Sequence, residues 1–206
     1  MTNILMRIDF QNDFVHKHGA LSIKNEDLIA AHQKFADNLF TNNFDKIIET
    51  YDTHFVETYP NTIEAKSFPL HCVFGTWGWQ SAAPFKPELN VIKMYKSTTN
   101  IWNEIHQYQD LNINWHDKNV YLCGLLSDVC IKEAMNGLLK KGANVIILSD
   151  LCQGAEQQIS DIIAKDVYRP FIEQSKLKTM TTAQFFRTAL RNKKIAHNLV
   201  KRDLGE

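Results

Sequence analysis

Several features are scarce or missing in this chain of 206 residues, and each absence narrows the class of protein. Neither sign of charge is in excess, since 23 lysines and arginines balance 23 aspartates and glutamates. The balance excludes the basic surplus typical of nucleic-acid binding proteins. No apolar run is long enough to span a bilayer, and Arg7 interrupts the N-terminal apolar stretch too early for a signal peptide. We therefore expect a cytoplasmic protein whose partner is a small molecule rather than nucleic acid or membrane.

Paired cysteines, a glycine-rich loop and a linker are missing as well. The four cysteines show no CxxC spacing, which predicts free thiols rather than a disulfide framework. No glycine-rich phosphate loop follows the first expected strand, and this counts against a flavodoxin-like nucleotide binder. Because no repeat or Pro/Gly-rich linker divides the chain, we expect a single domain over residues 1–206, ending in a terminal helix and tail at roughly residues 186–206.

The pattern that is present alternates strands with helices. The expected strands cover residues 3–10, 46–52, 90–96, 119–123, 144–150 and 177–185. The expected helices cover residues 23–39, 101–111 and 155–174, with a further one that starts near Cys130 and ends before Gly142. Strands rich in Val, Ile and Leu that alternate with helices indicate a parallel sheet. We predict a three-layer α/β fold, a six-stranded parallel sheet with helices on both faces.

The stretch of residues 124–130 places a thiol between a strand and a helix. Cys130 follows the buried strand 119–123 and lies at the expected N-terminus of the next helix. Free N–H groups and the positive end of the helix dipole favour a thiolate at such a position. A buried cysteine that only packs between helix and sheet is the alternative.

Three further polar residues follow or end expected strands. Asp9, Asp52 and Lys96 close the first, second and third strands, so a parallel sheet would gather them with Cys130 at one edge. A carboxylate can accept the thiol proton, and a lysine can stabilise the thiolate. Each residue also has a plain structural interpretation, as a turn or cap residue or a solvated strand end. Lys93 competes with Lys96 but points to the opposite face of its strand.

A second group of polar residues begins at the same Asp52. Asp52 and His54 point the same way in an extended segment, and Glu64 and His71 lie further along the long loop of residues 53–87. Two histidines and two carboxylates suit Zn²⁺, with Mn²⁺ or Fe²⁺ as alternatives. The competing interpretation is a polar loop that is held together by its own hydrogen bonds.

In order, these motifs resemble one family of enzymes. Residues 8–14 with 19–21 are similar to D-x-Q-N-D-F…G-x-L, and residues 51–54 with 68–76 to D-x-H…[WF]-P-x-H-C-x-x-G-T. Residues 96–102 fit K-x-x-x-S-x-F, and residues 124–131 fit G-x-A-T-D-x-C-V. Over roughly residues 3–185 the chain resembles the isochorismatase-like cysteine hydrolases, and within them the nicotinamidases and pyrazinamidases most.

The resemblance implies a set of roles. A catalytic triad would consist of Asp9, Lys96 and Cys130, with an oxyanion hole formed by the backbone N–H groups of Leu126 and Cys130 after a cis Leu125–Leu126 peptide bond. The substrate pocket would be lined by Phe14, Phe68, Trp102 and Leu125. One divalent metal ion, most often zinc, would bind Asp52, His54, Glu64 and His71 and orient the substrate ring. The implied reaction is hydrolysis of nicotinamide to nicotinate and ammonia through a cysteine thioester.

The chain departs from the family pattern at positions that concern the substrate. A second histidine soon after D-x-H is missing, and Glu64 fits the role of a replacement ligand. Leu126 stands where alanine is usual, and Asn100 where serine is usual. Two alternatives therefore stay open: a related amidase that acts on another small amide or a carbamoyl or ureido compound, and a non-catalytic binding domain. The sequence is also compatible with a homo-oligomer.

Overall fold

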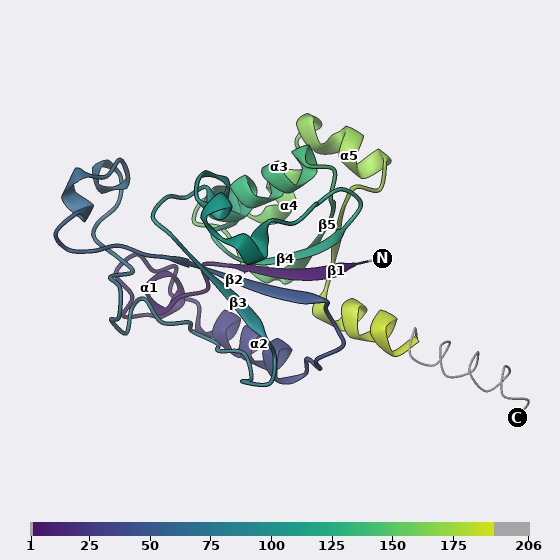
Figure 1. Ribbon diagram of the computed structural model, residues 1–206, viewed down its shortest axis with the longest axis horizontal. Helices are drawn as coiled ribbons and strands as arrows, with labels where there is room; N and C mark the ends of the chain where they lie inside the picture. The colour runs from purple at the N-terminus through teal and green to yellow at the C-terminus, as the bar shows by residue number, and fades with distance from the viewer. Residues whose placement is uncertain (1, 192–206) are drawn as a thin grey trace, which may run out of the picture.

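The computed structural model describes residues 2–191 and contains a six-stranded sheet in which all neighbouring strands are parallel (Figure 1). The strands are β1 (Asn3–Ile8), β2 (Lys46–Asp52), β3 (Val91–Lys96), β4 (Asn119–Leu125), β5 (Asn144–Gln153) and β6 (Leu177–Met180). Their order is β3-β2-β1-β4-β5-β6, so the chain builds outward from β1 in one direction and from β4 in the other. The crevice between β1 and β4 at their carboxyl ends is where such sheets place ligands.

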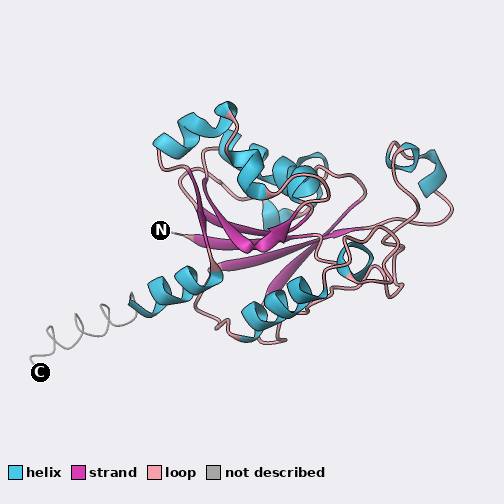
Figure 2. Cartoon of the chain, turned by 180° about the vertical axis from the view of Figure 1, so that it is seen from behind, coloured by secondary structure: helices cyan, strands magenta, loops and turns pink. Residues whose placement is uncertain are grey.

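Helices cover both faces of the sheet, which confirms the predicted layers. The helices are α1 (Asn12–Val15), α2 (Glu26–Asp37), α3 (Lys132–Lys140), α4 (Ile159–Ile163) and α5 (Arg169–Glu173), followed by a helix over residues 182–191. Figures 1 and 2 show α3, α4 and α5 on one face, and α2 with the helix of residues 182–191 on the other. The part of the expected tail that follows residue 191 lies outside the described residues.

Helix α2 illustrates how local sequence sets these elements. The Asn25 side chain accepts the Leu28 N–H at 3.0 Å, and Glu26 and Asp27 lie in the first turn, where the helix dipole favours negative charge. Leu28 and Phe35 recur on one face and are buried against the sheet.

The helix expected over residues 101–111 does not form. Three separate 3₁₀ turns replace it, at Ile101–Asn103, Ile105–Gln107 and Gln109–Leu111. The Asn100 side chain accepts the Trp102 N–H, and the Tyr108 hydroxyl bonds both the N–H and the C=O of Tyr95 on the edge strand β3. The Asn100 bond caps the first of these turns, and the Tyr108 bonds fasten the segment to β3.

The helix expected over residues 155–174 is broken into pieces. Backbone N–H groups of residues 155–157 donate to the Asp128 carboxylate instead of starting a helix, and α4 begins only at Ile159. Pro170 does not bend a long helix but stands in the first turn of α5, where its missing N–H costs no hydrogen bond. Within residues 2–191, no helix combines the length and hydrophobicity that a bilayer crossing requires. All four cysteines are buried and free, as expected.

A buried ion pair joins β1 and β2 in the middle of the sheet. Arg7 and Glu49 are register partners, and the guanidinium bonds Glu49 Oε1. Tyr51 and Ser81 donate further hydrogen bonds to the same carboxylate, and the Phe85 ring lies 3.8 Å from Arg7 Cζ. Both charged residues are almost fully buried, so each depends on the other for compensation.

We expect Arg7→Met to destabilise the fold by about 3–5 kcal/mol, because it leaves the Glu49 carboxylate buried without its cation. Urea unfolding at neutral pH measures the change. The double variant Arg7→Met/Glu49→Leu removes both charges and should recover most of the loss. A single variant as stable as the wild type would show that the pair is solvated or dispensable.

Candidate active site

Lys96 is at the centre of a buried group formed by the ends of three strands. Asp52 and Lys96 are register partners at the ends of β2 and β3, and Asp9 directly follows β1. Lys96 Nζ lies 2.7 Å from Asp9 Oδ2, 3.5 Å from Asp52 Oδ1 and 3.9 Å from Cys130 Sγ. Burial opposes the charged ammonium, but the two carboxylates raise the pKa of Lys96 well above its ordinary value. Lys93 is exposed and does not join this group.

Asp9 leaves the strand in a conformation that aims its carboxylate at the group. Its φ is +46°, so β1 ends at Ile8 and not at Phe10 as expected. Thr50 accepts the Asp9 N–H at 3.1 Å and donates its hydroxyl to Asp9 Oδ1 at 2.7 Å. Burial raises the pKa of Asp9 and Lys96 opposes the rise. A carboxyl group in this setting is able to accept and return a proton.

Cys130 stands in a π-helical turn, Ser127–Ile131, between β4 and α3. The Leu126 carbonyl accepts the N–H groups of both Val129 and Ile131 at 3.1 Å, which holds the turn closed. The peptide bond between Leu125 and Leu126 is cis, as the resemblance implies. Turns of this kind are frequent at functional sites.

The expectation of an easily ionised thiol is wrong for this arrangement. Cys130 is only 7% exposed, and burial raises the pKa of its thiol well above the ordinary value. The charge of Lys96 lowers that pKa by less, and the neighbouring Asp9 raises it again. The thiol is therefore protonated at rest and within hydrogen-bonding reach of Asp9, so its proton must leave as it reacts.

The four predicted metal-binding residues converge beside this group. One ligand atom each from Asp52, His54, Glu64 and His71 lies within 4.8 Å of all the others. Asp52 Oδ2 is 3.2 Å from His54 Nε2 and 2.9 Å from His71 Nε2, and Glu64 Oε2 is 3.1 Å from His54 Nε2. Asp52 thus touches both the two imidazoles and Lys96.

The arrangement of donors and acceptors fits a cation at this place. His71 Nδ1 lies 2.7 Å from the Pro69 carbonyl, which can only accept, so Nδ1 carries a proton. In the neutral imidazole Nε2 then presents its lone pair to the Asp52 carboxylate. Glu64 Oε2 faces only the ring nitrogen of His54, and the buried Oε1 has no hydrogen-bond partner among the described residues. Lone pairs from several groups that face one another are what a divalent metal ion satisfies.

A small cavity joins the thiol to the candidate metal ligands. This inner cavity is lined by Phe14, Leu21, Asp52, Glu64, Phe68, His71, Thr99, Leu125, Leu126, Val129 and Cys130. Three of the four predicted pocket residues are therefore present, namely Phe14, Phe68 and Leu125. Trp102 is not among them, because its indole N–H donates to the Glu133 carbonyl at 3.1 Å and its ring packs on Trp115.

Two residues that sequence reasoning did not assign to the site hold its carboxylates in place. Gln11 donates to the Asp52 carbonyl and accepts the Asp52 N–H, both at 2.8 Å. Thr50 holds Asp9 as described. Thr50 could have been found, because it stands two residues before Asp52 on the same face of β2. Gln11 could also have been found, because it is the glutamine of the D-x-Q-N-D-F motif that begins at Asp9.

Comparison with known proteins identifies the family to which most of the chain belongs. A model of the isochorismatase domain matches residues 3–182 of the sequence. Among proteins of curated function, none matches the sequence significantly.

Solved structures with the same fold include three amidases. The nicotinamidase of Bacillus subtilis is 19% identical with a TM-score of 0.59, covering 87% of this chain and 99% of its own. The pyrazinamidase of Pyrococcus horikoshii in complex with zinc is 21% identical with a TM-score of 0.67, covering 88% and 99%. The N-carbamoylsarcosine amidase of Thermoplasma acidophilum is 16% identical with a TM-score of 0.63, covering 88% and 97%. At these identities the likeness establishes the fold.

We expect the protein to bind one equivalent of Zn²⁺ and Glu64→Gln to weaken that binding, because the change removes a buried anionic ligand. Competition with a chromogenic chelator measures the affinity without any substrate. His106→Gln, which alters an exposed histidine far along the chain, serves as the control. Equal zinc affinity for Glu64→Gln and the wild type would remove Glu64 from the ligand set.

Proposed function

The chain belongs to the isochorismatase family, and on this premise we propose that it is a metal-dependent cysteine amidase of the nicotinamidase type. It would hydrolyse nicotinamide to nicotinate and ammonia. The observation that carries the proposal is the inner cavity, which is lined both by Cys130 and by Asp52, Glu64 and His71. The zinc-bound pyrazinamidase and the nicotinamidase among the structures of like fold support the same activity.

In the proposed reaction Cys130 Sγ attacks the amide carbon, and a carbon–sulfur bond forms as the thiol proton passes to the Asp9 carboxylate. The raised pKa of the thiol makes this transfer necessary, and the hydrogen-bonding contact with Asp9 makes it direct. Backbone N–H groups of Leu126 and Cys130, at the two sides of the π-helical turn, are the proposed donors to the oxyanion.

Asp9 then returns the proton to the amide nitrogen, the carbon–nitrogen bond breaks, and ammonia leaves a thioester on Cys130. Water attacks the thioester with Asp9 as the base, and the acid leaves as the thiol regains its proton. Lys96 stays charged throughout and holds Asp9 in place through its 2.7 Å contact. Its positive charge also offsets the negative charge that develops on sulfur.

Phe14 and Phe68 line the cavity where the acyl group of the substrate would lie, and flat aromatic faces suit a pyridine ring. A divalent ion held by Asp52, His54, Glu64 and His71 would supply a coordination position for a lone pair of the substrate, such as a ring nitrogen. The second candidate is an amidase for a carbamoyl compound, which the likeness to N-carbamoylsarcosine amidase favours.

We expect the zinc-loaded protein to release ammonia from nicotinamide and Cys130→Ala to abolish this release, because Cys130 is the one thiol among the described residues that line the inner cavity. A coupled glutamate dehydrogenase assay measures the ammonia. Cys123→Ala, a cysteine of the sheet core, is the matched control and should remain active. Zinc-loaded wild-type protein that leaves nicotinamide intact but hydrolyses an N-carbamoyl amino acid would establish the second candidate instead.

We expect Asp9→Asn to lower kcat by about 10²–10⁴-fold, because an amide cannot accept the thiol proton. Steady-state kinetics measure the loss, and near-UV circular dichroism confirms that the variant is folded. A fall in kcat of less than tenfold would assign proton transfer to another group.

A further inference from the structure

Three of the four candidate metal ligands come from a loop rather than from the sheet. His54, Glu64 and His71 lie between β2 and β3, whereas the fourth ligand ends β2. Between His54 and His71, regular structure is limited to the 3₁₀ turns Tyr59–Asn61 and Glu64–Lys66. Strand register alone therefore does not set the distances among these ligands, and side-chain contacts within the loop have to do so.

Tyr59 is the side chain of this loop that turns inward. Among residues 55–70 it alone is buried, with 4% of its surface exposed, while apolar neighbours such as Ile63 are exposed. Its ring centroid lies 4.7 Å from that of His54 and 5.8 Å from that of His71, at interplanar angles of 69° and 86°. The tyrosine ring thus packs edge-to-face against both imidazoles.

The Tyr59 hydroxyl is bound to the peptides directly before His71. Its oxygen lies 2.9 Å from the carbonyl oxygens of both Phe68 and Pro69. Carbonyl oxygens only accept, so the phenolic proton is donated to this pair. The Pro69 carbonyl also accepts the Nδ1–H of His71 at 2.7 Å. The hydroxyl therefore holds the acceptor that determines which nitrogen of His71 carries the proton and how the ring is turned.

The backbone of Tyr59 is tied to the turn that carries Glu64. Its carbonyl accepts the Thr62 N–H at 2.9 Å and the Thr62 hydroxyl at 2.8 Å, and the same hydroxyl oxygen accepts the Ala65 N–H at 3.2 Å. Tyr59 is thus connected to each of the three ligands of the loop, by its ring, its hydroxyl or its backbone.

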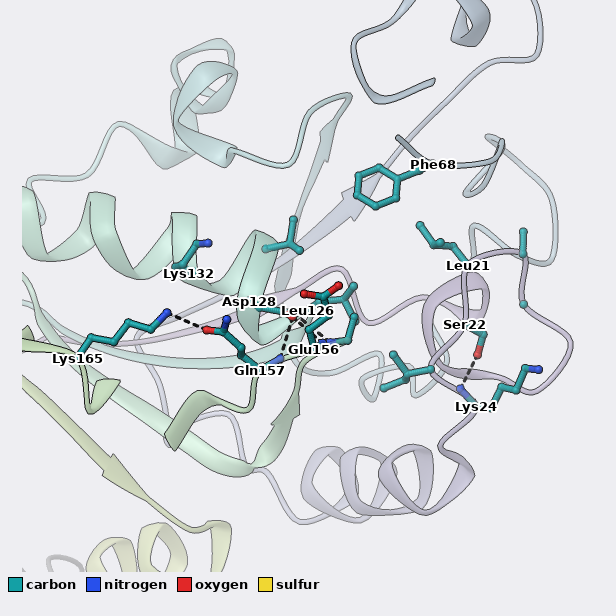
Figure 3. Close-up of a pocket in the computed structure, with 15 residues that line it drawn as sticks. Leu21, Ser22, Lys24, Phe68, Leu126, Asp128, Lys132, Glu156, Gln157 and Lys165 are labelled. Atoms are coloured by element: carbon teal, nitrogen blue, oxygen red, sulfur yellow. Dashed lines mark hydrogen bonds between the residues drawn. The ribbon is translucent and has the colours of Figure 1, made fainter. Parts of the chain in front are cut away.

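Phe68, whose carbonyl the Tyr59 hydroxyl contacts, belongs to the wall of the inner cavity together with Cys130. Its ring also lines a wider groove of about 770 Å³, and in Figure 3 it points from its own loop toward the space among the labelled residues. One hydroxyl group therefore links a candidate metal ligand to an aromatic wall of the cavity.

We propose that Tyr59 is a positioning residue of the site, whose hydroxyl orients the His71 imidazole through the Pro69 carbonyl and places the Phe68 ring through the Phe68 carbonyl. The inference rests on the proposed metal-dependent amidase activity and adds a residue that touches neither the reacting atoms nor the metal ion. Because the hydroxyl orients a ligand and is not one itself, its removal weakens metal binding without abolishing it.

The test uses Tyr59→Phe, which removes the hydroxyl and keeps the ring, with Tyr168→Phe as the matched control. Tyr168 is also buried, and its hydroxyl donates to Asn136 of α3 at 2.9 Å rather than to the loop of the ligands. In competition with a chromogenic chelator, Tyr59→Phe should bind Zn²⁺ about tenfold more weakly than the wild type, as expected for a group that orients a metal-ligating histidine. Tyr168→Phe should bind Zn²⁺ as the wild type does.

Hydrolysis of nicotinamide at saturating Zn²⁺ gives a second measurement. Tyr59→Phe should raise KM several-fold, because the Phe68 wall loses its anchor, and should leave kcat within about twofold, because Asp9, Lys96 and Cys130 are unchanged. A variant that merely contained less folded protein would show the opposite, a lower apparent kcat at the same KM.

The outcomes separate this inference from the proposed function. Wild-type protein that binds Zn²⁺ but leaves nicotinamide intact contradicts the proposed substrate, and the zinc affinities then decide the role of Tyr59. Equal zinc affinity for Tyr59→Phe and the wild type, or an equal loss in Tyr168→Phe, overturns the role toward His71, and an unchanged KM overturns the role toward Phe68. Wild-type protein that binds no divalent ion contradicts the metal site itself and, with it, the inference.

Discussion

A single buried ammonium group, that of Lys96, is the constraint on which the arrangement of this site depends. A charge of this kind costs several kcal/mol to bury unless opposite charges surround it. Here Asp9 and Asp52 supply them, at 2.7 Å and 3.5 Å. The three residues come from the ends of three adjacent strands, so the register of β1, β2 and β3 sets their distances. No loop has to fold correctly for the base and the cation to meet.

The same ammonium lies between the proposed nucleophile, Cys130, and the candidate metal ligands. Lys96 lies 3.9 Å from Cys130 Sγ, while its partner Asp52 contacts both His54 and His71. Asp9 and Asp52 contact Lys96, whereas Glu64 contacts His54. A divalent cation at the candidate ligands would offset the negative charge of Asp52 and Glu64. The electrostatics of the proposed triad and of the candidate metal site are therefore coupled through Asp52, which contacts Lys96 and both histidines.

The sequence predicted what depends on strands and failed where side chains override local pattern. The strand of residues 46–52 and the convergence of Asp9, Lys96 and Cys130 follow from apolar runs and parallel topology, which are local and regular. The expected helix of residues 101–111 is replaced by three 3₁₀ turns, and the Tyr108 hydroxyl ties this segment to Tyr95 of β3, a contact that the local pattern does not reveal. Trp102 was misplaced for the same reason, since its direction depends on that irregular segment.

The state of the thiol could not be predicted because it depends on burial, which a sequence does not state. A position at a helix N-terminus favours a thiolate, and this much the pattern indicated. Burial of Cys130 instead raises the pKa of its thiol, and this burial results from loops that are far apart in the chain. Phe14, Phe68 and Leu126, from three such segments, line the same cavity as Cys130.

The residues proposed to react and the residues that line the cavity come largely from different parts of the fold. Sheet register places Asp9 and Lys96, whereas Cys130 stands in the turn after β4 and much of the inner cavity wall comes from loops. Loops accept substitution more readily than a buried sheet does. Leu126 belongs to both parts, since its backbone leads into the turn that carries Cys130 and its side chain lines the inner cavity. A change of its side chain would therefore alter the shape of the cavity, while the backbone of the turn stays in place.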